Sequence, residues 1–345
     1  MRAAYFASFQ GPIEIRDVPE PQPPGDGVII RVGASGVCRS DWHGWMGHDP
    51  DVRLPHVPGH EFAGTIERAG PEVEKWKAGD RVTVPFCVGC GTCPRCVAGF
   101  SNICDRYYQP GFTGWGSFAE LVAIPHADFN LVRLPDTMDF VTAASLGCRF
   151  ATAWRAVVAQ ANAGEGEWIT VFGCGGVGLS AIMIAKAFGM RPIAVDISTA
   201  AMDLALEIGA EETVDANRAD LVEEIHRLTN GGAHASIDAL GSATTCRNAI
   251  LSLRKRGRHV QVGLLGGLAA RHAVPMERVI AWELEIVGSH GLQAAEYDRM
   301  LAMIKQGRLE PSRLICRTIS LDELPDALAH IDRNQWTGVS VVDRF

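Results

Sequence analysis

The feature that most constrains the fold is a glycine-rich string in the middle of the chain, Gly173-Cys174-Gly175-Gly176-Val177-Gly178. A run that is typical of a buried strand, 168–172, ends directly before it, and a helix-like stretch, 177–188, begins inside it. This order of strand, G-x-G-x-x-G turn and helix is typical of the first βαβ unit of a dinucleotide-binding fold. An ordinary glycine turn in an α/β protein without a ligand remains the alternative.

Each residue of the string has a physical role if a dinucleotide binds there. Gly173 would allow the tight turn, Gly175 would let backbone amides approach a pyrophosphate, and Gly178 would allow the helix to pack closely on the strand. Gly176 and Val177 would begin a helix whose amino end faces the phosphate charge.

An acidic residue ends the next predicted strand. Asp196 lies 23 residues after Gly173. A carboxylate there can accept hydrogen bonds from ribose hydroxyls and would repel a 2′-phosphate, which favours NAD over NADP. A solvent-facing carboxylate at a strand end remains the alternative for Asp196.

The pattern of apolar residues divides the chain into two regions. Strand-like and helix-like runs alternate through 151–290, which predicts a doubly wound parallel sheet, the Rossmann fold. Residues 1–150 instead contain short β-branched runs at 28–34, 62–67 and 81–86 among many prolines and glycines, so we expect strands joined by irregular loops. Residues 291–345 add a helix and a last strand at 340–342. The sequence therefore predicts an α/β protein of two domains.

Four cysteines lie within fifteen residues, at Cys90, Cys93, Cys96 and Cys104. The glycines and proline between them let the backbone wrap around one ion, and four thiolates suit tetrahedral zinc. A closed shell of four cysteines leaves no open position, so this zinc would be structural. A redox-active Cys-x-x-Cys pair and four merely buried thiols are the alternatives. The predicted zinc lobe spans about 87–106.

Charge and hydropathy exclude several classes of protein. The net charge of −8 disfavours nucleic acid or an anionic membrane as a partner, because both reward clustered Lys and Arg. The longest near-apolar stretch, 177–188, contains Lys186 and is too short to cross a bilayer. Residues 1–10 lack the layout of a secretory signal, so we expect a cytoplasmic protein whose partner is a small molecule.

Two further segments combine thiol, imidazole and carboxylate groups: Cys38-Arg39-Ser40-Asp41-Trp42-His43 and Gly59-His60-Glu61. We place both on loops between strands. Cys38 and His60 are plausible zinc ligands, although a lone Cys is more often a small core residue and a lone His more often an ordinary hydrogen-bonded group. A third ligand is needed.

The chain resembles the zinc-dependent alcohol dehydrogenases of the medium-chain dehydrogenase/reductase family along its whole length. Cys38-x4-His43, Gly59-His60-Glu61-x2-Gly64, the four-cysteine lobe, Ser145-Leu146-Gly147-Cys148 and Gly173–Gly178 follow one another in the family's order. The resemblance implies a GroES-like catalytic domain formed by 1–150 and 291–345, and a Rossmann NAD-binding domain at 151–290. It implies hydride transfer between an alcohol and NAD, with two zinc ions in each chain.

The resemblance also implies roles for single residues. Cys38, His60 and Cys148 correspond to the ligands of a catalytic zinc, and Glu61 corresponds to a carboxylate that can approach the metal. Asp41 corresponds to the residue that orients the imidazole of His60. Ser40 corresponds to the hydroxyl that contacts the substrate oxygen, and His43 to the outer member of a proton relay; a plain surface histidine is the alternative for His43.

Other positions gain a meaning in the same way. Trp45 and Phe86 correspond to residues that line the substrate pocket, with core packing as the alternative. Arg39 corresponds to a pyrophosphate contact, and Val262-Gly263-Leu264 to the backbone beside the nicotinamide; an exposed, solvated charge is the alternative for Arg39.

The sequence departs from the family at two positions and leaves some assignments open. Many relatives carry a basic residue just before the final strand valines, where this chain has Val339-Ser340, and Ala201 lies where a lysine is common. We expect core thiols at the remaining cysteines, Cys87, Cys174, Cys246 and Cys316.

Alternatives also remain for the function. A polyol, threonine or formaldehyde dehydrogenase would share every motif, and a zinc- and nucleotide-binding sensor without activity would share most of them. Chains of this length in the family are commonly homo-oligomers, and we favour a tetramer over a dimer.

Overall fold

The computed structural model describes residues 1–265, 274–331 and 336–345. Its contacts divide the chain into two compact units. The first unit contains Met1–Ala151, Gly291–Ala302 and Ile315–Phe345, and the second contains Thr152–His290 and Met303–Leu314.

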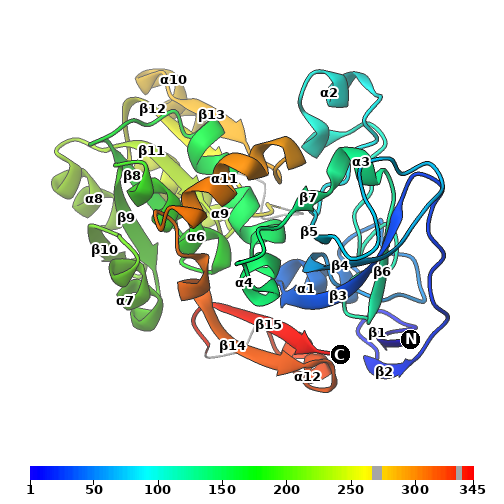
Figure 1. Ribbon diagram of the computed structural model, residues 1–345. Coiled ribbons are helices and arrows are strands. Elements are labelled where there is room, and N and C mark those ends of the chain that lie inside the picture. Colours follow the sequence, from blue (N-terminus) through cyan, green and yellow to red (C-terminus); the bar gives the residue numbers. More distant parts are fainter. Residues whose placement is uncertain (266–273, 332–335) are drawn as a thin grey trace. The chain divides into compact units, whose positions relative to one another are not determined.

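The second unit is built on a six-stranded sheet with the order β10-β9-β8-β11-β12-β13. Every neighbouring pair in it is parallel, and helices join successive strands (Figure 1). The strands are β8 (Trp168–Phe172), β9 (Arg191–Asp196), β10 (Glu212–Asp215), β11 (Ala233–Asp238), β12 (Leu253–Gln261) and β13 (Glu285–Gly288). The helices are η3 (Arg155–Gln160), α6 (Gly176–Ala187), α7 (Thr199–Glu207), α8 (Leu221–Thr229), α9 (Ala243–Leu251), α10 (Met276–Trp282) and η6 (Pro311–Leu314). The predicted doubly wound parallel sheet is confirmed.

The chain reverses direction across this sheet between β8 and β11. It runs from β8 outward to β9 and β10, then returns to place β11 on the other side of β8. Ligands of doubly wound sheets bind at the carboxyl ends of the strands beside such a reversal. The glycine string Gly173–Gly178 follows β8, so it lies at this point.

Strand β10 was missed by the sequence prediction. Its residues are Glu-Thr-Val-Asp, and Val214 is the single buried member. An outer strand of a sheet buries few side chains, so it lacks the apolar run that marked β8.

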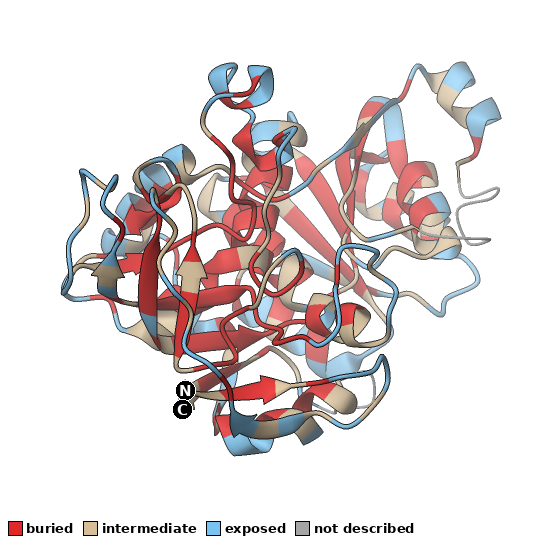
Figure 2. Ribbon diagram, turned by 90° about the vertical axis from the view of Figure 1, so that its right-hand side faces the viewer, coloured by how far each residue is buried: buried red, intermediate tan, exposed pale blue. Residues whose placement is uncertain are grey.

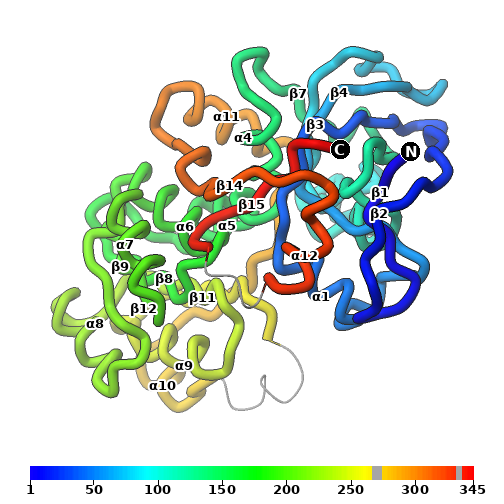
Figure 3. Tube along the Cα trace, turned by 90° about the horizontal axis from the view of Figure 1, so that it is seen from below, coloured from blue at the N-terminus to red at the C-terminus, as the bar shows by residue number. Residues whose placement is uncertain are grey.

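The first unit contains a seven-stranded sheet with the order β14-β15-β3-β4-β5-β7, in which β6 pairs with β3, and a two-stranded sheet of β1 and β2. The tube in Figure 3 shows β15 bringing the carboxyl end of the chain back beside β3, in antiparallel register. These strands are β1 (Arg2–Tyr5), β2 (Glu14–Asp17), β3 (Val28–Val37), β4 (Glu61–Ala69), β5 (Arg81–Thr83), β6 (Leu121–Ile124), β7 (Val132–Arg133), β14 (Ile315–Ser320) and β15 (Val339–Arg344).

Apolar side chains of these strands form the core of the first unit. Val28, Ile30, Phe62, Ile66 and Val122 belong to one buried cluster of at most 1% exposure each. The burial colouring in Figure 2 shows the central strands of both units as mostly buried, while the outer turns are exposed.

Short helices join the strands of the first unit. They are α1 (Arg39–Trp45), α2 (Pro94–Val97), η1 (Ser101–Ile103), α3 (Ala127–Asn130), α4 (Phe140–Ala144), η2 (Leu146–Phe150), η5 (Ala294–Glu296), η7 (Leu321–Glu323) and α12 (Leu324–Ala329). Two helices cross the boundary between the units, α5 (Ala151–Trp154) and α11 (Tyr297–Lys305).

Helix α1 corrects the expectation that Cys38 to His43 form a loop. Cys38 is the N-cap, and the Asp41 carboxylate accepts a hydrogen bond from the Cys38 backbone N–H at 3.1 Å. This capping pair starts a helix that the frequent prolines and glycines of the region concealed.

The segment Met303–Leu314 lies with the second unit, although the sequence placed all of 291–345 in the first domain. Arg308 donates a hydrogen bond from Nη2 to the carbonyl of Ala187 at 2.8 Å, and Arg313 donates to the carbonyl of Glu207 at 2.9 Å. Those carbonyls end α6 and α7 and have no partner within their helices. The two arginines therefore tie the segment to the Rossmann-type unit.

Within the described ranges, no helix combines the length and apolar composition that a bilayer crossing requires.

Candidate functional site

Four side chains from distant parts of the sequence meet in the first unit. The ligand atoms of Cys38, His60, Glu61 and Cys148 all lie within 4.8 Å of one another. Cys38 follows β3 and caps α1, His60 precedes β4, and Cys148 lies in η2. The resemblance had named these four residues together, and the fold brings them together.

The imidazole of His60 has one satisfied nitrogen and one free nitrogen. Its Nδ1 lies 2.8 Å from Asp41 Oδ1, and its buried Nε2 has no hydrogen-bond partner among the described residues. Buried polar atoms are nearly always paired, so an orphaned nitrogen beside two thiols indicates a missing partner. Zinc, which accepts imidazole nitrogen and thiolate sulfur, fits this set of donors.

The two thiols of the cluster differ in acidity. A hydrogen bond from Cys148 lowers the pKa of the Cys38 thiol well below its usual value, although burial opposes this shift. The same hydrogen bond, together with burial, raises the pKa of Cys148. Cys38 is therefore the thiol that carries negative charge first, and a thiolate is the form that binds metal.

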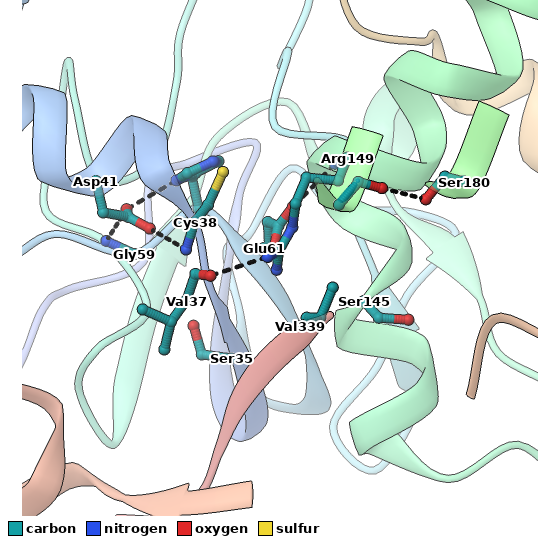
Figure 4. Close-up of polar contacts among 12 residues, drawn as sticks. Ser35, Val37, Cys38, Asp41, Gly59, Glu61, Ser145, Arg149, Ser180 and Val339 are labelled. Carbon is teal, nitrogen blue, oxygen red and sulfur yellow. Dashed lines mark hydrogen bonds and ion pairs between the residues drawn. The ribbon is translucent and has the colours of Figure 1, made fainter. Parts of the chain in front are cut away.

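Asp41 holds the cluster together through three hydrogen bonds. It accepts from the backbone N–H of Cys38 at 3.1 Å, from the backbone N–H of Gly59 at 3.0 Å and from His60 Nδ1 at 2.8 Å. The close-up in Figure 4 shows the carboxylate between Cys38 and Gly59. Because Asp41 is 1% exposed, water cannot replace these contacts.

Glu61 is turned toward a partner that the sequence analysis missed. Its carboxylate accepts hydrogen bonds from the backbone N–H and the guanidinium of Arg149. Both side chains are buried. No pattern in the sequence predicts that Glu61 pairs with Arg149, because an arginine after Cys148 is typical of an ordinary helix.

Ser40 and His43 lie on α1, next to the cluster in sequence. Ser40 is half-buried, and His43 Nδ1 lies 3.0 Å from Nδ1 of His48. Burial lowers the pKa of His43, and the nearby charges of His48 and Arg39 lower it further. His48 is a second residue that sequence reasoning missed.

Aromatic rings surround His60. Phe86 contacts its imidazole edge-on with centroids 6.1 Å apart, and Phe112, which the sequence did not indicate, does so at 5.3 Å. Trp45 instead donates to the carbonyl of Gly11 at 2.8 Å and packs against the cluster of Phe6, Val52 and Phe112. The environment of Trp45 is that of a packing residue at the edge of this cluster.

The second candidate metal site is the four-cysteine lobe. The Sγ atoms of Cys90, Cys93, Cys96 and Cys104 all lie within 4.8 Å of one another, around α2 and η1. Burial raises the pKa of Cys90, but hydrogen bonds from backbone N–H groups and from Arg106 outweigh it and lower the pKa to about 5. None of the ten cysteines, all of which lie in the described ranges, forms a disulfide. A donor set of four sulfur atoms fits zinc.

The candidate dinucleotide site lies in the second unit. Gly173 has φ +91°, a Cβ added at Gly178 would overlap the carbonyl of Gly173, and a Cβ added at Gly175 would meet no atom of another described residue within 4 Å. These are the three properties that the turn, the close packing and the approach of a pyrophosphate require. Gly176 and Val177 form the first turn of α6, with Gly175 as its N-cap.

Asp196 contacts the glycine turn directly. Its Oδ2 accepts a hydrogen bond from the Cys174 backbone N–H at 2.6 Å, and its Oδ1 accepts from Ser198 at 2.9 Å. The carboxylate therefore fixes the turn against the end of β9 while remaining half-exposed.

The other expected cofactor contacts follow. Val262 and Gly263 both donate to the carbonyl of Asp238, at 3.1 and 2.8 Å, and Leu264 is 74% exposed. Arg39 is exposed in the first unit, with its guanidinium 5.8 Å from the ring of Trp42.

Three of the four remaining cysteines are buried, as expected for core thiols: Cys87, Cys174 and Cys246. The expectation for Cys316 was wrong, because it is exposed on β14, where alternate residues face outward.

Comparison with known proteins finds family models and relatives that are similar to this chain. Residues 24–136 match the alcohol dehydrogenase GroES-like domain, and residues 176–306 match the zinc-binding dehydrogenase domain. An alcohol dehydrogenase of Geobacillus stearothermophilus is 35% identical, and the match covers 98% of each chain. An NAD-dependent alcohol dehydrogenase of Sulfurisphaera tokodaii is 34% identical over 99% of each chain. The solved structure of an alcohol dehydrogenase from Thermus sp. ATN1 superposes with a TM-score of 0.91 at 29% identity, over 100% of both chains.

Proposed function

The chain belongs to the zinc-dependent alcohol dehydrogenase family of medium-chain dehydrogenases, and from this premise we propose which of its residues carry the reaction. It is an NAD-dependent enzyme that transfers a hydride between an alcohol and NAD. The observation that carries the proposal is the set of Cys38, His60 and Cys148, in which the buried His60 Nε2 has no hydrogen-bond partner in the part of the chain that the structure describes. We assign these three residues as the ligands of a catalytic zinc.

Cys38, His60 and Cys148 would hold the zinc, and three protein ligands would leave a position for the substrate oxygen. When bound, zinc stabilises negative charge on that oxygen and NAD accepts the hydride. Asp41 keeps the proton of His60 on Nδ1, so that Nε2 is available to the metal. Phe86 and Phe112 place apolar rings edge-on against the imidazole.

The residues of α1 handle the proton in this assignment. Ser40 is the hydroxyl that contacts the substrate oxygen, and His43 is the base that takes the proton toward solvent. The lowered pKa of His43 keeps its imidazole neutral, the form that can accept a proton. Its neighbour His48 is exposed and lies at hydrogen-bond distance, which supports passage of the proton to water.

We assign the second zinc to Cys90, Cys93, Cys96 and Cys104, where a closed shell of four thiolates makes a structural site. The total would then be two zinc ions in each chain. We assign the dinucleotide to Gly173–Gly178, Val262 and Leu264, with the ribose on Asp196 and with Arg39 as a pyrophosphate contact. The half-exposed carboxylate of Asp196 supports a preference for NAD over NADP.

We also propose a homo-oligomer, with a tetramer favoured over a dimer. Strand β13 is the outer strand of its sheet and exposes Ile286, while α10 beside it exposes Met276 and Ile280. A sheet edge that no described strand covers, with exposed apolar side chains on and near it, favours association. The lack of disulfides among the ten described cysteines supports a reducing compartment, in agreement with the proposed cytoplasmic location.

Substitution of Ser40 tests the proposed reaction. Ser40→Ala should lower kcat for alcohol oxidation by about 10²- to 10⁴-fold, the range for a positioned acid-base group, while zinc content and NAD binding persist. Ser40→Thr keeps the hydroxyl and should retain activity, and Ser312→Ala, at an exposed position, is the matched control. Alcohol oxidation by Ser40→Ala at the unmodified rate would remove Ser40 from the reaction.

A further inference from the structure

The carboxylate of Glu61 lies among the proposed zinc ligands, but its hydrogen bonds go elsewhere. Oε1 accepts from the backbone N–H of Arg149 at 2.9 Å and from Arg149 Nε at 3.0 Å, while Oε2 accepts from Arg149 Nη2. Nη1 of Arg149 donates to the carbonyl of Val37 at 2.9 Å, which anchors the guanidinium to β3. Figure 4 shows Arg149 between Glu61 and Val37. One residue thus occupies both oxygens of the carboxylate.

Two glycines provide the space for this ion pair. A Cβ added at Gly36 would lie 2.5 Å from Glu61 Oε2 and 2.9 Å from Arg149 Nη2. A Cβ added at Gly147 would lie 2.9 Å from the Cα of Glu61. Neither glycine has a positive φ, so close approach explains them better than backbone freedom.

Two cations could neutralise the charge of the Glu61 carboxylate: the guanidinium of Arg149 and the proposed zinc. Glu61 is fully buried and Arg149 is 8% exposed. Burial raises the pKa of Glu61, and the charge of Arg149 opposes that shift. A buried carboxylate that loses its cation is strongly destabilised, so it would turn to the nearest remaining positive charge. At this place that charge is the zinc held by Cys38, His60 and Cys148.

We propose that Arg149 is a positioning residue that holds Glu61 away from the catalytic zinc and thereby keeps the fourth coordination position open. The inference rests on the proposed function, because it requires zinc at the Cys38 cluster. It assigns to Arg149 a role in substrate access to the metal without direct contact between Arg149 and the substrate.

When cobalt replaces zinc in the holoenzyme, its visible absorption reports directly on what occupies the fourth coordination position. Imidazole added to the cobalt enzyme should bind at the open position and shift the visible d–d absorption, which gives its Kd. In Arg149→Met, Glu61 should occupy that position in about nine molecules of ten or more, which leaves about a tenth of the protein competent and weakens imidazole binding by about tenfold or more. The double variant Arg149→Met/Glu61→Gln should restore the unmodified Kd. A purely structural role for Arg149 predicts no such rescue.

Two further variants keep the test decisive if Arg149→Met folds poorly. Glu61→Gln alone should leave the cobalt spectrum and the imidazole Kd unchanged, because Glu61 is not a ligand while Arg149 is present. Arg149→Lys retains a cation and should weaken imidazole binding less than Arg149→Met. Arg227→Met, at an exposed arginine paired with Glu224, is the matched control.

The outcomes separate this inference from the function on which it rests. Unchanged imidazole binding in Arg149→Met, no recovery in the double variant, or an altered spectrum in Glu61→Gln would each overturn the role of Arg149. A cobalt spectrum that does not depend on Cys38 would instead overturn the proposed metal site, and this inference with it.

Discussion

Replacing Asp41 with Asn should weaken zinc binding, because no orientation of the amide satisfies the three donors that face it. Oδ1 of Asp41 accepts from Gly59 N–H and His60 Nδ1, and Oδ2 accepts from Cys38 N–H. If the amide oxygen takes the place of Oδ1, its NH2 group meets the N–H of Cys38. If the oxygen takes the place of Oδ2, the NH2 group meets the N–H of Gly59, and His60 must move its proton to Nε2, the nitrogen assigned to zinc.

The size of the effect follows from the number of unpaired donors. Each orientation of the introduced amide leaves at least one buried N–H without an acceptor, at a cost of about 1–3 kcal/mol. Because Asp41 is 1% exposed, solvent does not relieve that cost. The free energy of unfolding should fall by that amount, and the zinc Kd should rise about 10- to 100-fold, the range for a lost outer partner of a metal ligand.

Competition with a chromogenic chelator would measure the zinc Kd of the unmodified protein, of Asp41→Asn and of the exposed control Asp203→Asn. Asp203→Asn should match the unmodified protein. A zinc Kd for Asp41→Asn within twofold of the unmodified value, in a protein that remains folded, would refute the proposal that Asp41 sets the tautomer of His60.

Three further predictions concern the structural zinc, the choice of cofactor and the proton relay. Cys93→Ala should remove one zinc from each chain and lower Tm by about 2–4 °C for each kcal/mol of stability lost, because structural zinc contributes folding free energy. Cys38→Ala should remove the other zinc. Elemental analysis that finds one zinc in the unmodified chain would contradict this pair of expectations. Asp196→Ala should reduce the preference for NAD over NADP, measured as a ratio of kcat/KM values, by about tenfold or more, which is about 1.4 kcal/mol. An unchanged ratio would exclude the ribose contact. His48 contributes to the lowered pKa of His43 after burial, so His48→Gln should raise the pKa of His43 and move the acidic limb of the rate of alcohol oxidation to higher pH; an unmoved limb would show that the two imidazoles do not interact.

Local sequence patterns predicted the Rossmann-type sheet well, because the strand, the glycine turn and the helix that identify it follow one another directly in the chain. The run that forms β8 is buried at all five positions, and the glycine turn and α6 follow it directly. Strand β10 and helix α1 lacked such signals. The first buries a single side chain, and the second begins through the pairing of Cys38 with Asp41.

The candidate metal cluster could be predicted only in part from residue types. Cys38 and His60 lie near other polar residues, whereas Cys148 is 88 residues beyond His60 and required a family pattern. The partners that the fold adds, Arg149 and His48, could not be predicted, because their roles depend on which way a side chain turns in three dimensions. Phe112 escaped notice for the same reason, since an aromatic residue in a loop gives no indication that its ring faces His60.

The hydrogen bonds from Arg308 and Arg313 to the ends of α6 and α7 affect which part of this chain can be expressed as a separate fragment. The backbone passes between the two units four times, after Ala151, His290, Ala302 and Leu314. A fragment limited to 152–290 would therefore leave the carbonyls of Ala187 and Glu207 without their guanidinium partners. An excised cofactor-binding fragment needs residues 303–314 supplied as well, either through a designed connection or as a separate peptide.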